Sequence, residues 1–118
     1  MNEALMKKYA ETFTEKVAVI HSAFEDSPRT VAFVKIPSEI TNTTLQLEYA
    51  YKWTNNIEGS WSLKIGGDAN DNVTVVGEFP ISKKSGEKMG LRSTSMNDQI
   101  LLGNKKYKVS MIGFEEII

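Results

Sequence analysis

The chemistry open to this chain depends first on its few reactive side chains. The 118 residues include one histidine, His21, and no cysteine. The imidazole therefore has no second histidine or thiolate with which to build a metal site, and thiol nucleophiles and disulfides are absent together. Because His21 lies in an apolar run, the sequence favours a packed residue over a catalyst.

Motifs for covalent, acid–base and phosphate chemistry are missing as well. No serine stands in a Gly-x-Ser-x-Gly elbow, and Ser85-Gly86-Glu87-Lys88 lacks the glycine spacing and final Lys-Ser/Thr of a phosphate-binding loop. Glu48 and Glu58 are carboxylates that nothing in the sequence places together as an acid–base pair.

One segment resembles a calcium loop in part. Asp68-Ala69-Asn70-Asp71-Asn72 places oxygen ligands at positions 1, 3 and 5 of that pattern. Position 6 should be glycine and is Val73, and position 12 should be glutamate and is Phe79. The segment is therefore interpreted as a turn. From these motifs we expect no enzyme activity, no catalytic residue, no metal and no cofactor.

Positive charge is concentrated in one part of the chain. The formal net charge of -1 argues against a strongly electrostatic nucleic-acid-binding protein overall. Residues 81–108, however, carry seven basic and two acidic side chains, whereas residues 1–80 carry seven basic and eleven acidic ones. Such a segment is either a solvated face with its loop or a patch that faces an anion.

The polar segment 91–100, LRSTSMNDQI, has two interpretations. In the structural one, Ser95 or Asp98 accepts hydrogen bonds from nearby backbone N–H groups and sets the register of the strand that follows. In the functional one, a guanidinium and three hydroxyl groups form a lip that binds an oxyanion beside the lysine-rich loop. The residues of this lip are Arg92, Ser93, Thr94 and Ser95.

Aromatic side chains gather around Asn55 and Asn56. Aromatic groups beside amides stack on bases or anchor a protein partner, but at helical spacing they are also typical of a core. Trp61 stands in a loop that does not require its burial, so we expect it to be an exposed anchor. The candidate binding surface joins this anchor to the basic and hydroxyl-rich residues: Trp61, Lys83, Lys84, Lys88, Arg92, Ser93, Thr94 and Ser95.

Helices and strands must position these residues, and the first predicted element is a helix over residues 3–13. Asn2 supplies its N-cap, and apolar side chains recur at helical spacing. Residues 16–24 fit either a continuation of that stripe or a strand. We favour the strand, because it gives residues 30–36, which are apolar on both faces, a hairpin partner.

Residues 45–53 also carry two periods. Leu45, Tyr49 and Trp53 recur at helical spacing, while every second residue is apolar as in a half-buried strand. Cap residues in front of the segment and its helix-forming composition favour a helix.

The C-terminal half favours strands. A strand is predicted at Val73-Thr74-Val75-Val76, and residues 99–102 and 106–112 flank a Gly-Asn turn as a β-hairpin. Phe114 and Ile117-Ile118 are expected to dock the terminus on the core.

These elements predict an α+β protein: a single small domain, residues 1–118, with two helices packed on a mainly antiparallel sheet that ends in a C-terminal β-hairpin. A content of 41% hydrophobic and 25% charged residues is typical of such a domain. No apolar run approaches the roughly 20 residues of a membrane span, and no signal peptide is recognised. We therefore expect a cytoplasmic protein without a membrane partner.

Three segments carry a family resemblance. They are residues 49–62 (YAYKWTNNIEGSWS), residues 92–100 (RSTSMNDQI) and residues 107–115, which end in Gly-Phe-Glu. They resemble small uncharacterised proteins carried by bacteriophages, cyanophages among them, and by other mobile elements, in which Arg-Ser-Thr-Ser-x-Gly-Asp precedes a terminal hairpin. Asn97 stands where that group has glycine, and asparagine also tolerates a positive φ, so the turn is expected to survive.

The resemblance covers about half of the chain and implies a phage-like origin and an α+β fold, but no activity. With the missing catalytic set, it leads us to expect a non-enzymatic protein-binding or regulatory module whose partner is an unidentified protein, of a host cell if the chain is phage-encoded. The alternative is a nucleic-acid-binding module that uses the basic segment 81–108. A small hydrolase or transferase built on dispersed residues is the least favoured hypothesis.

Overall fold

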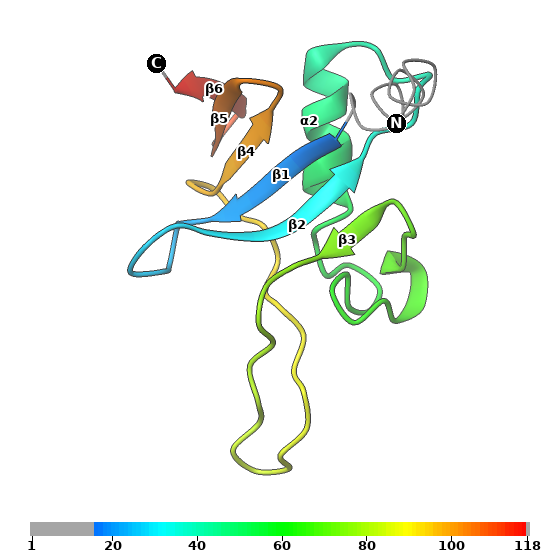
Figure 1. Cartoon of the computed structure of the whole chain (residues 1–118), viewed down its shortest axis with the longest axis vertical. Helices are drawn as coiled ribbons and strands as arrows, with labels where there is room; N and C mark the ends of the chain where they lie inside the picture. The colour runs from blue at the N-terminus through cyan, green and yellow to red at the C-terminus, as the bar shows by residue number, and fades with distance from the viewer. Residues whose placement is uncertain (1–15, 118) are drawn as a thin grey trace, which may run out of the picture.

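The computed structural model describes residues 16–117, and of Lys16 only the backbone. These residues form one α-helix and six strands (Figure 1). The strands are β1 Lys16–His21, β2 Arg29–Lys35, β3 Val73–Val75, β4 Gln99–Leu102, β5 Lys105–Ser110 and β6 Gly113–Ile117. The helix is α2 Thr43–Lys52, and a short 3₁₀ turn, η1 Gly66–Asp68, precedes β3.

All these strands join one antiparallel sheet in the order β3-β2-β1-β4-β5-β6. β1 lies inside the sheet, where Val19 pairs with Ala32 of β2 and with Ile100 of β4. The pairing of Ile20 with Gln99 places the residues after β1 directly beside the residues before β4. Two segments far apart in the sequence therefore meet at this end of the sheet.

The β1–β2 hairpin confirms the strand interpretation of residues 16–24 and their pairing with residues 30–36. Val17 lies opposite Val34 and Ala18 opposite Phe33, with a bulge between Val19 and Ile20. β-branched residues favour this extended pairing, because their stiff side chains pack well on a pleated surface.

α2 confirms the helix predicted for residues 45–53. Asn42 is its N-cap, and the Asn42 Oδ1 atom accepts the backbone N–H of Leu45 at 3.1 Å. Leu47 and Ala50 are buried, and the helix packs against β1 and β4. Helical spacing and the cap therefore decide a segment in which strict alternation also favoured a strand.

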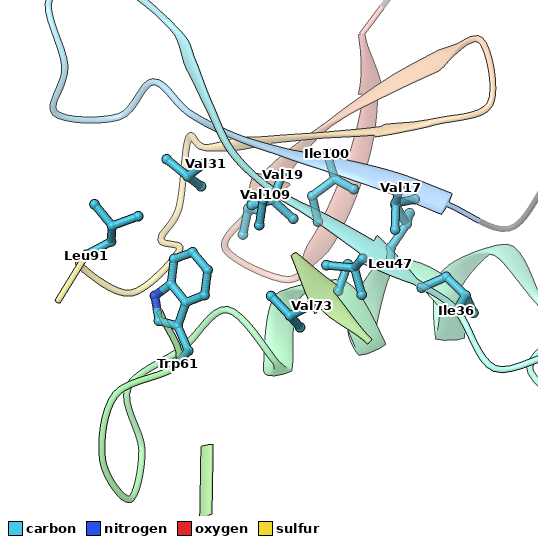
Figure 2. Close-up of a cluster of buried hydrophobic side chains, with 13 residues drawn as sticks. Val17, Val19, Val31, Ile36, Leu47, Trp61, Val73, Leu91, Ile100 and Val109 are labelled. Carbon is cyan, nitrogen blue, oxygen red and sulfur yellow. The ribbon is translucent and has the colours of Figure 1, made fainter. Parts of the chain in front are cut away.

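The core lies between α2 and one face of the sheet (Figure 2). Val17, Val19 and Ile100 are fully buried there. In Figure 2 Trp61 and Leu91 stand at one end of this cluster and Ile36 at the other. The core thus extends from the sheet centre to the loops that hold the polar residues of the candidate site.

The expectation of two helices on the sheet is wrong for the part of the chain that the structure describes. Residues 16–117 contain one α-helix and a wholly antiparallel six-stranded sheet, so strands predominate. The helix predicted over residues 3–13 lies outside the described residues. None of the helices within residues 16–117 has the length and apolar character that crossing a membrane requires.

The sixth strand was not predicted, because GFEEI does not alternate between apolar and polar residues. The Phe114 ring meets Tyr51 edge-on with ring centroids 6.2 Å apart, so this residue docks on the helix as expected. Ile117 is 42% exposed, and the expectation that it docks on the core is wrong. Ile118 lies outside the described residues.

Candidate binding site

Arg92 and Asp98 form a bidentate ion pair at the centre of the candidate site. Arg92 Nη1 donates to Asp98 Oδ2 at 2.7 Å, and Nη2 donates to Oδ1 at 2.8 Å. Asp98 is fully buried. Its carboxylate also accepts the backbone N–H groups of Ser22, Ala23 and Ser95 at 2.8, 2.9 and 2.8 Å. One carboxylate thereby ties the β1–β2 connection to the segment before β4.

These contacts determine the ionisation of the pair. Burial by itself raises the pKa of Asp98, but the hydrogen bonds from Arg92 and from three backbone N–H groups outweigh it and lower that pKa to about 2. The hydrogen bonds with Asp98 raise the pKa of Arg92. Both groups are therefore charged at neutral pH.

The structural interpretation of segment 91–100 is confirmed by this geometry. Besides accepting the N–H of Ser95, Asp98 donates its own backbone N–H to the carbonyl of Ser95 at 3.0 Å. Asn97, between them, has φ 77°, in the left-handed region that asparagine tolerates. The turn expected from the resemblance is formed without the glycine.

Glu25 occupies the remaining edge of Arg92. Arg92 Nε donates to Glu25 Oε2 at 3.1 Å and Nη2 to Oε1 at 2.8 Å, and these bonds lower the pKa of Glu25. Since Nη1 also donates to the carbonyl of Ser93 at 2.8 Å, all five N–H groups of the guanidinium have partners. Phe24, which is 75% exposed, lies with its ring centroid 4.8 Å from Arg92 Cζ.

Behind the ion pair, a buried chain of hydrogen bonds fixes the tautomer of His21. Thr54 Oγ1 donates to the carbonyl of Ala50 at 2.8 Å, and Thr94 Oγ1 donates to Thr54 Oγ1 at 2.8 Å. Each hydroxyl has one proton, so Thr94 Oγ1 can only accept from His21 Nε2, which lies 3.0 Å away. Neutral His21 therefore carries its proton on Nε2.

Burial lowers the pKa of His21, and the negative charge of Asp98, with Oδ2 4.0 Å from Nε2, opposes that shift. The imidazole is consequently neutral at pH 7 and acts as a packed donor. The sequence expectation that His21 is packed agrees with its exposure of 2%.

Trp61 is not the exposed anchor that the sequence suggested. Its side chain is fully buried, and its indole Nε1–H donates to the carbonyl of Arg92 at 2.9 Å. Its ring meets His21 edge-on at a centroid distance of 6.3 Å. The loop around Trp61 does not demand burial by itself, but the ring joins the core cluster with Leu91 and binds the carbonyl of Arg92, both distant in the sequence.

The three hydroxyl residues of the expected oxyanion lip bind groups of the protein itself. Ser93 Oγ accepts the backbone N–H of Asn56 at 2.8 Å, and Ser95 Oγ donates to the carbonyl of Ser93 at 3.2 Å. Thr94 is buried in the chain of hydrogen bonds to His21. The structure therefore brings Arg92 and these hydroxyls together, but their hydrogen bonds connect loops of the protein and do not form an oxyanion lip.

The calcium-like segment is a turn, as interpreted. Asp68 Oδ2 accepts the backbone N–H groups of Ile57 and Glu58 at 2.9 and 3.0 Å. The side-chain amides of Asn70 and Asn72 both donate to the Tyr49 hydroxyl at 3.0 Å. Within residues 16–117, no group of three or more His, Cys, Asp or Glu side chains is arranged to hold a metal ion.

The basic loop is a long hairpin, here called the arm (residues 77–90), that extends away from the sheet in yellow-green and yellow (Figure 1). Its two limbs pair at Ile81 and Lys88, and Met89 N donates to the carbonyl of Pro80 at 2.7 Å. Gly86 closes the tip with φ 74°. The three candidate lysines of the arm are all exposed: Lys83, Lys84 and Lys88.

The basic segment 81–108 is divided between distant places. Lys105 and Lys108 lie on β5 beside acidic residues of the neighbouring strand β6, with N–O distances of 3.6 Å to Glu116 and 3.7 Å to Glu115. In Figure 1 β5 and the tip of the arm lie at opposite ends of the molecule. The charge excess counted along the sequence is therefore not one patch.

A cavity of about 430 Å³ lies at the root of the arm. Its lining includes His21 and Leu91 from the core, Glu25 and Arg92 from the ion-pair network, and Arg29 at the start of β2. The first limb of the arm contributes residues 78–80. The cavity therefore joins the buried polar network to the arm.

Sequence reasoning missed Glu25 and the central position of Asp98. Asp98 had a signal, since an aspartate directly before a strand is a capping residue. Glu25 had none, because it is 67 residues from its partner Arg92 and no local pattern connects them.

Comparison with protein-family models, with curated proteins and with solved structures finds no match to this chain. What the site does must therefore be inferred from its own residues.

Proposed function

We propose that this protein is a non-enzymatic binding module that contacts a protein partner through its arm. The observation that carries the proposal is the combination of exposed apolar and basic side chains on a hairpin that extends from the body. The resemblance to proteins carried by bacteriophages favours a host protein as the partner.

Apolar exposure on the arm supports a partner. Ile81 is 60% and Met89 is 50% exposed, although the arm could hold polar residues there without loss to the core. Burying such side chains against another surface contributes about 25 cal/mol for each Å² removed from water. Methionine and isoleucine on a protruding hairpin are thus suited to fill a pocket on a partner.

Charge on the arm favours an acidic partner. The arm carries Lys83, Lys84 and Lys88 against the acids Glu78 and Glu87, and Glu78 lies at its root, so the excess of positive charge is towards the tip. Lys88 Nζ lies 4.6 Å from the centroid of the Phe79 ring, which holds its cation beside the apolar residues. A protein segment that presents carboxylates around one or two large apolar side chains would match this arrangement.

Nucleic acid is the second class that the basic segment suggested. Lys105 and Lys108 face Glu116 and Glu115 and lie far from the arm, so few cations lie together to track a phosphate backbone. Ile81 and Met89, which flank the arm lysines in the sequence, also have no role in phosphate contact. The observations therefore favour a protein partner.

The test is an array of 12-residue peptides that differ in acidity and in apolar content, probed with the full chain. The variant Ile81→Ser with Met89→Ser removes the apolar contacts of the arm. Ile112→Ser is the matched control, since Ile112 is 96% exposed but lies in the β5–β6 turn. Peptides that combine Asp or Glu with Leu, Phe or Trp should be retained by the wild type and the control, and lost at least tenfold by the arm variant.

Equal retention by all three proteins would refute the arm as the contact. Binding to DNA or RNA, with affinity that falls steeply with salt and depends on Lys83 and Lys84, would replace the proposal with the nucleic-acid module.

A further inference from the structure

The guanidinium of Arg92 has one permanent and one exchangeable partner. Asp98 is fully buried and accepts three backbone N–H groups besides the guanidinium, so it cannot leave without breaking the loop joint. The Glu25 side chain is 23% exposed, and its other hydrogen bond is a local one of 3.2 Å from the N–H of Phe24. Glu25 is thus the partner that another anion can replace.

The geometry at Glu25 is that of a bound carboxylate ligand. Its two oxygens meet Nε and Nη2 of Arg92 side by side, which is how an arginine recognises a carboxylate or a phosphate. Phe24 covers the guanidinium plane and Asp98 holds its far edge. Arg92 would therefore keep its orientation if Glu25 moved away.

The cavity at the root of the arm leads to this edge. Arg92, Glu25 and Arg29 all line it. Among the described residues the Arg29 side chain makes one hydrogen bond, from Nη2 to the carbonyl of Glu78 at 3.2 Å. A carboxylate that replaced Glu25 on Arg92 would have a second guanidinium in the same cavity, whereas Glu25 itself is bonded to one.

We propose that Glu25 is a built-in competitor that occupies the carboxylate-binding edge of Arg92 until an acidic side chain of the protein partner displaces it. This inference rests on the proposed function, since the arm would deliver the acidic segment to the cavity at its root. The group of the partner that is recognised is a carboxylate, which Arg92 and Arg29 bind together. Because Glu25 competes from within the chain, the apparent affinity of the edge for an outside anion is its intrinsic affinity multiplied by the fraction of time that Glu25 leaves it free.

Citrate and inorganic phosphate are suitable probes, because they offer the two anion chemistries without the contacts of the arm. Binding is followed by NMR through the Arg92 Nε–H resonance and by titration calorimetry. Glu25→Ala should raise the citrate affinity at least roughly fivefold, because the internal competitor is gone. Glu87→Ala is the matched control: it removes the same charge from the arm tip, outside the cavity lining, and should change the affinity less than twofold.

Arg29→Gln, made in the Glu25→Ala background, should reverse most of that gain. A second measurement uses the wild type: saturating citrate should release Glu25 from Arg92 and raise its lowered pKa towards the ordinary value of 4.5. A stronger response to phosphate than to citrate would assign the edge to a phosphorylated ligand and overturn the carboxylate assignment.

Equal citrate affinities of Glu25→Ala and Glu87→Ala would overturn the competitor. That failure is distinct from failure of the arm, because the Ile81→Ser with Met89→Ser variant keeps Arg92 and Glu25 and is scored on peptides. A gain in citrate affinity without arm-dependent peptide binding would support the anion edge and reject the arm.

Discussion

Arg92 and the lysines of the arm come from the same basic segment, but they occupy opposite environments. Arg92 has five hydrogen-bonded N–H groups, one fully buried carboxylate and one half-buried carboxylate around it. Lys83 and Lys84 are exposed at the tip of a hairpin that extends from the body. Arg92 joins loops of the protein and is open to exchange only at the edge that Glu25 occupies, whereas the arm lysines are exposed to solvent.

The difference teaches that the partners of a charge decide its role, and its position along the chain does not. A buried ion pair is costly to form and more costly to break, because removal of one member leaves the other charged and desolvated. An exposed lysine is hydrated in both the folded and the unfolded chain, so its contribution to stability is small. Substitutions in the two regions should therefore separate stability from binding.

The largest effect is expected at Asp98. Asp98→Asn places an amide NH₂ against donors that now meet a carboxylate, and it leaves Arg92 without its buried counter-ion. The free energy of unfolding should fall by roughly 3 kcal/mol. Urea denaturation measures it, with Asp71→Asn, at an exposed aspartate, as the matched control that should stay within about 0.5 kcal/mol of the wild type. Equal midpoints for the two variants would reject the central role of Asp98.

The second-largest effect is expected in the loss of stability at low pH. The pKa of Asp98 is about 2 in the folded protein against an ordinary value of 3.8, so its contribution is complete above about pH 5 and is lost as the pH falls towards 2. The shift corresponds to about 2 kcal/mol. Urea midpoints at a series of pH values should show this loss in the wild type and much less of it in Asp98→Asn. A parallel decline in both proteins would assign the acid sensitivity to other groups.

His21 should cause a separate decline in the free energy of unfolding, at a higher pH than that of Asp98. Its folded pKa is lowered from the ordinary value of 6.5, so the unfolded chain takes up the proton first, and stability should begin to fall as the pH drops below about 6.5. Proton NMR of the imidazole checks the direction directly. A ring that titrates above pH 6.5 in the folded protein would contradict it.

Thr94 tests the hydrogen-bond chain behind the ion pair. Thr94→Val keeps the shape but removes the acceptor of His21 Nε2–H and the donor to Thr54. One buried donor left without a partner costs about 1–3 kcal/mol, so a loss near the lower end of that range is expected. Thr74→Val is the control, since Thr74 is exposed on β3 and should tolerate valine. A loss no larger than that of the control would show that His21 finds another acceptor.

Local patterns predicted the local parts of this fold. The pairing of β1 with β2, the cap and spacing of α2, and the turn at Asn97 each depend on a single continuous stretch of sequence. β6 was missed because GFEEI does not alternate between apolar and polar residues, and the described residues are therefore richer in strand than expected. The helix predicted over residues 3–13 lies outside the described residues and stays a prediction.

The candidate site depends on contacts that no local pattern contains. Trp61 looked exposed because its own loop is polar, yet its Nε1–H binds the carbonyl of Arg92, 31 residues further along the chain. Glu25 reaches Arg92 across 67 positions, because the pairing of β1 with β4 brings their loops together. These contacts were not predicted because their partners are far apart in the sequence, although the hydrogen bonds between them are strong.

The smallest effect on stability should come from the arm lysines. Lys83→Glu with Lys84→Glu reverses two exposed charges that touch no part of the core, so the free energy of unfolding should change by less than about 0.5 kcal/mol. Binding of an acidic peptide from the array should nevertheless fall at least tenfold, since like charges then face each other. Arg92→Gln should behave in the opposite way in urea, with a loss of several kcal/mol although it changes the net charge by less than the double lysine variant does. If the free energy of unfolding of the arm variant also fell by several kcal/mol, the arm lysines would contribute to the stability of the fold. Their role would then not differ from that of Arg92.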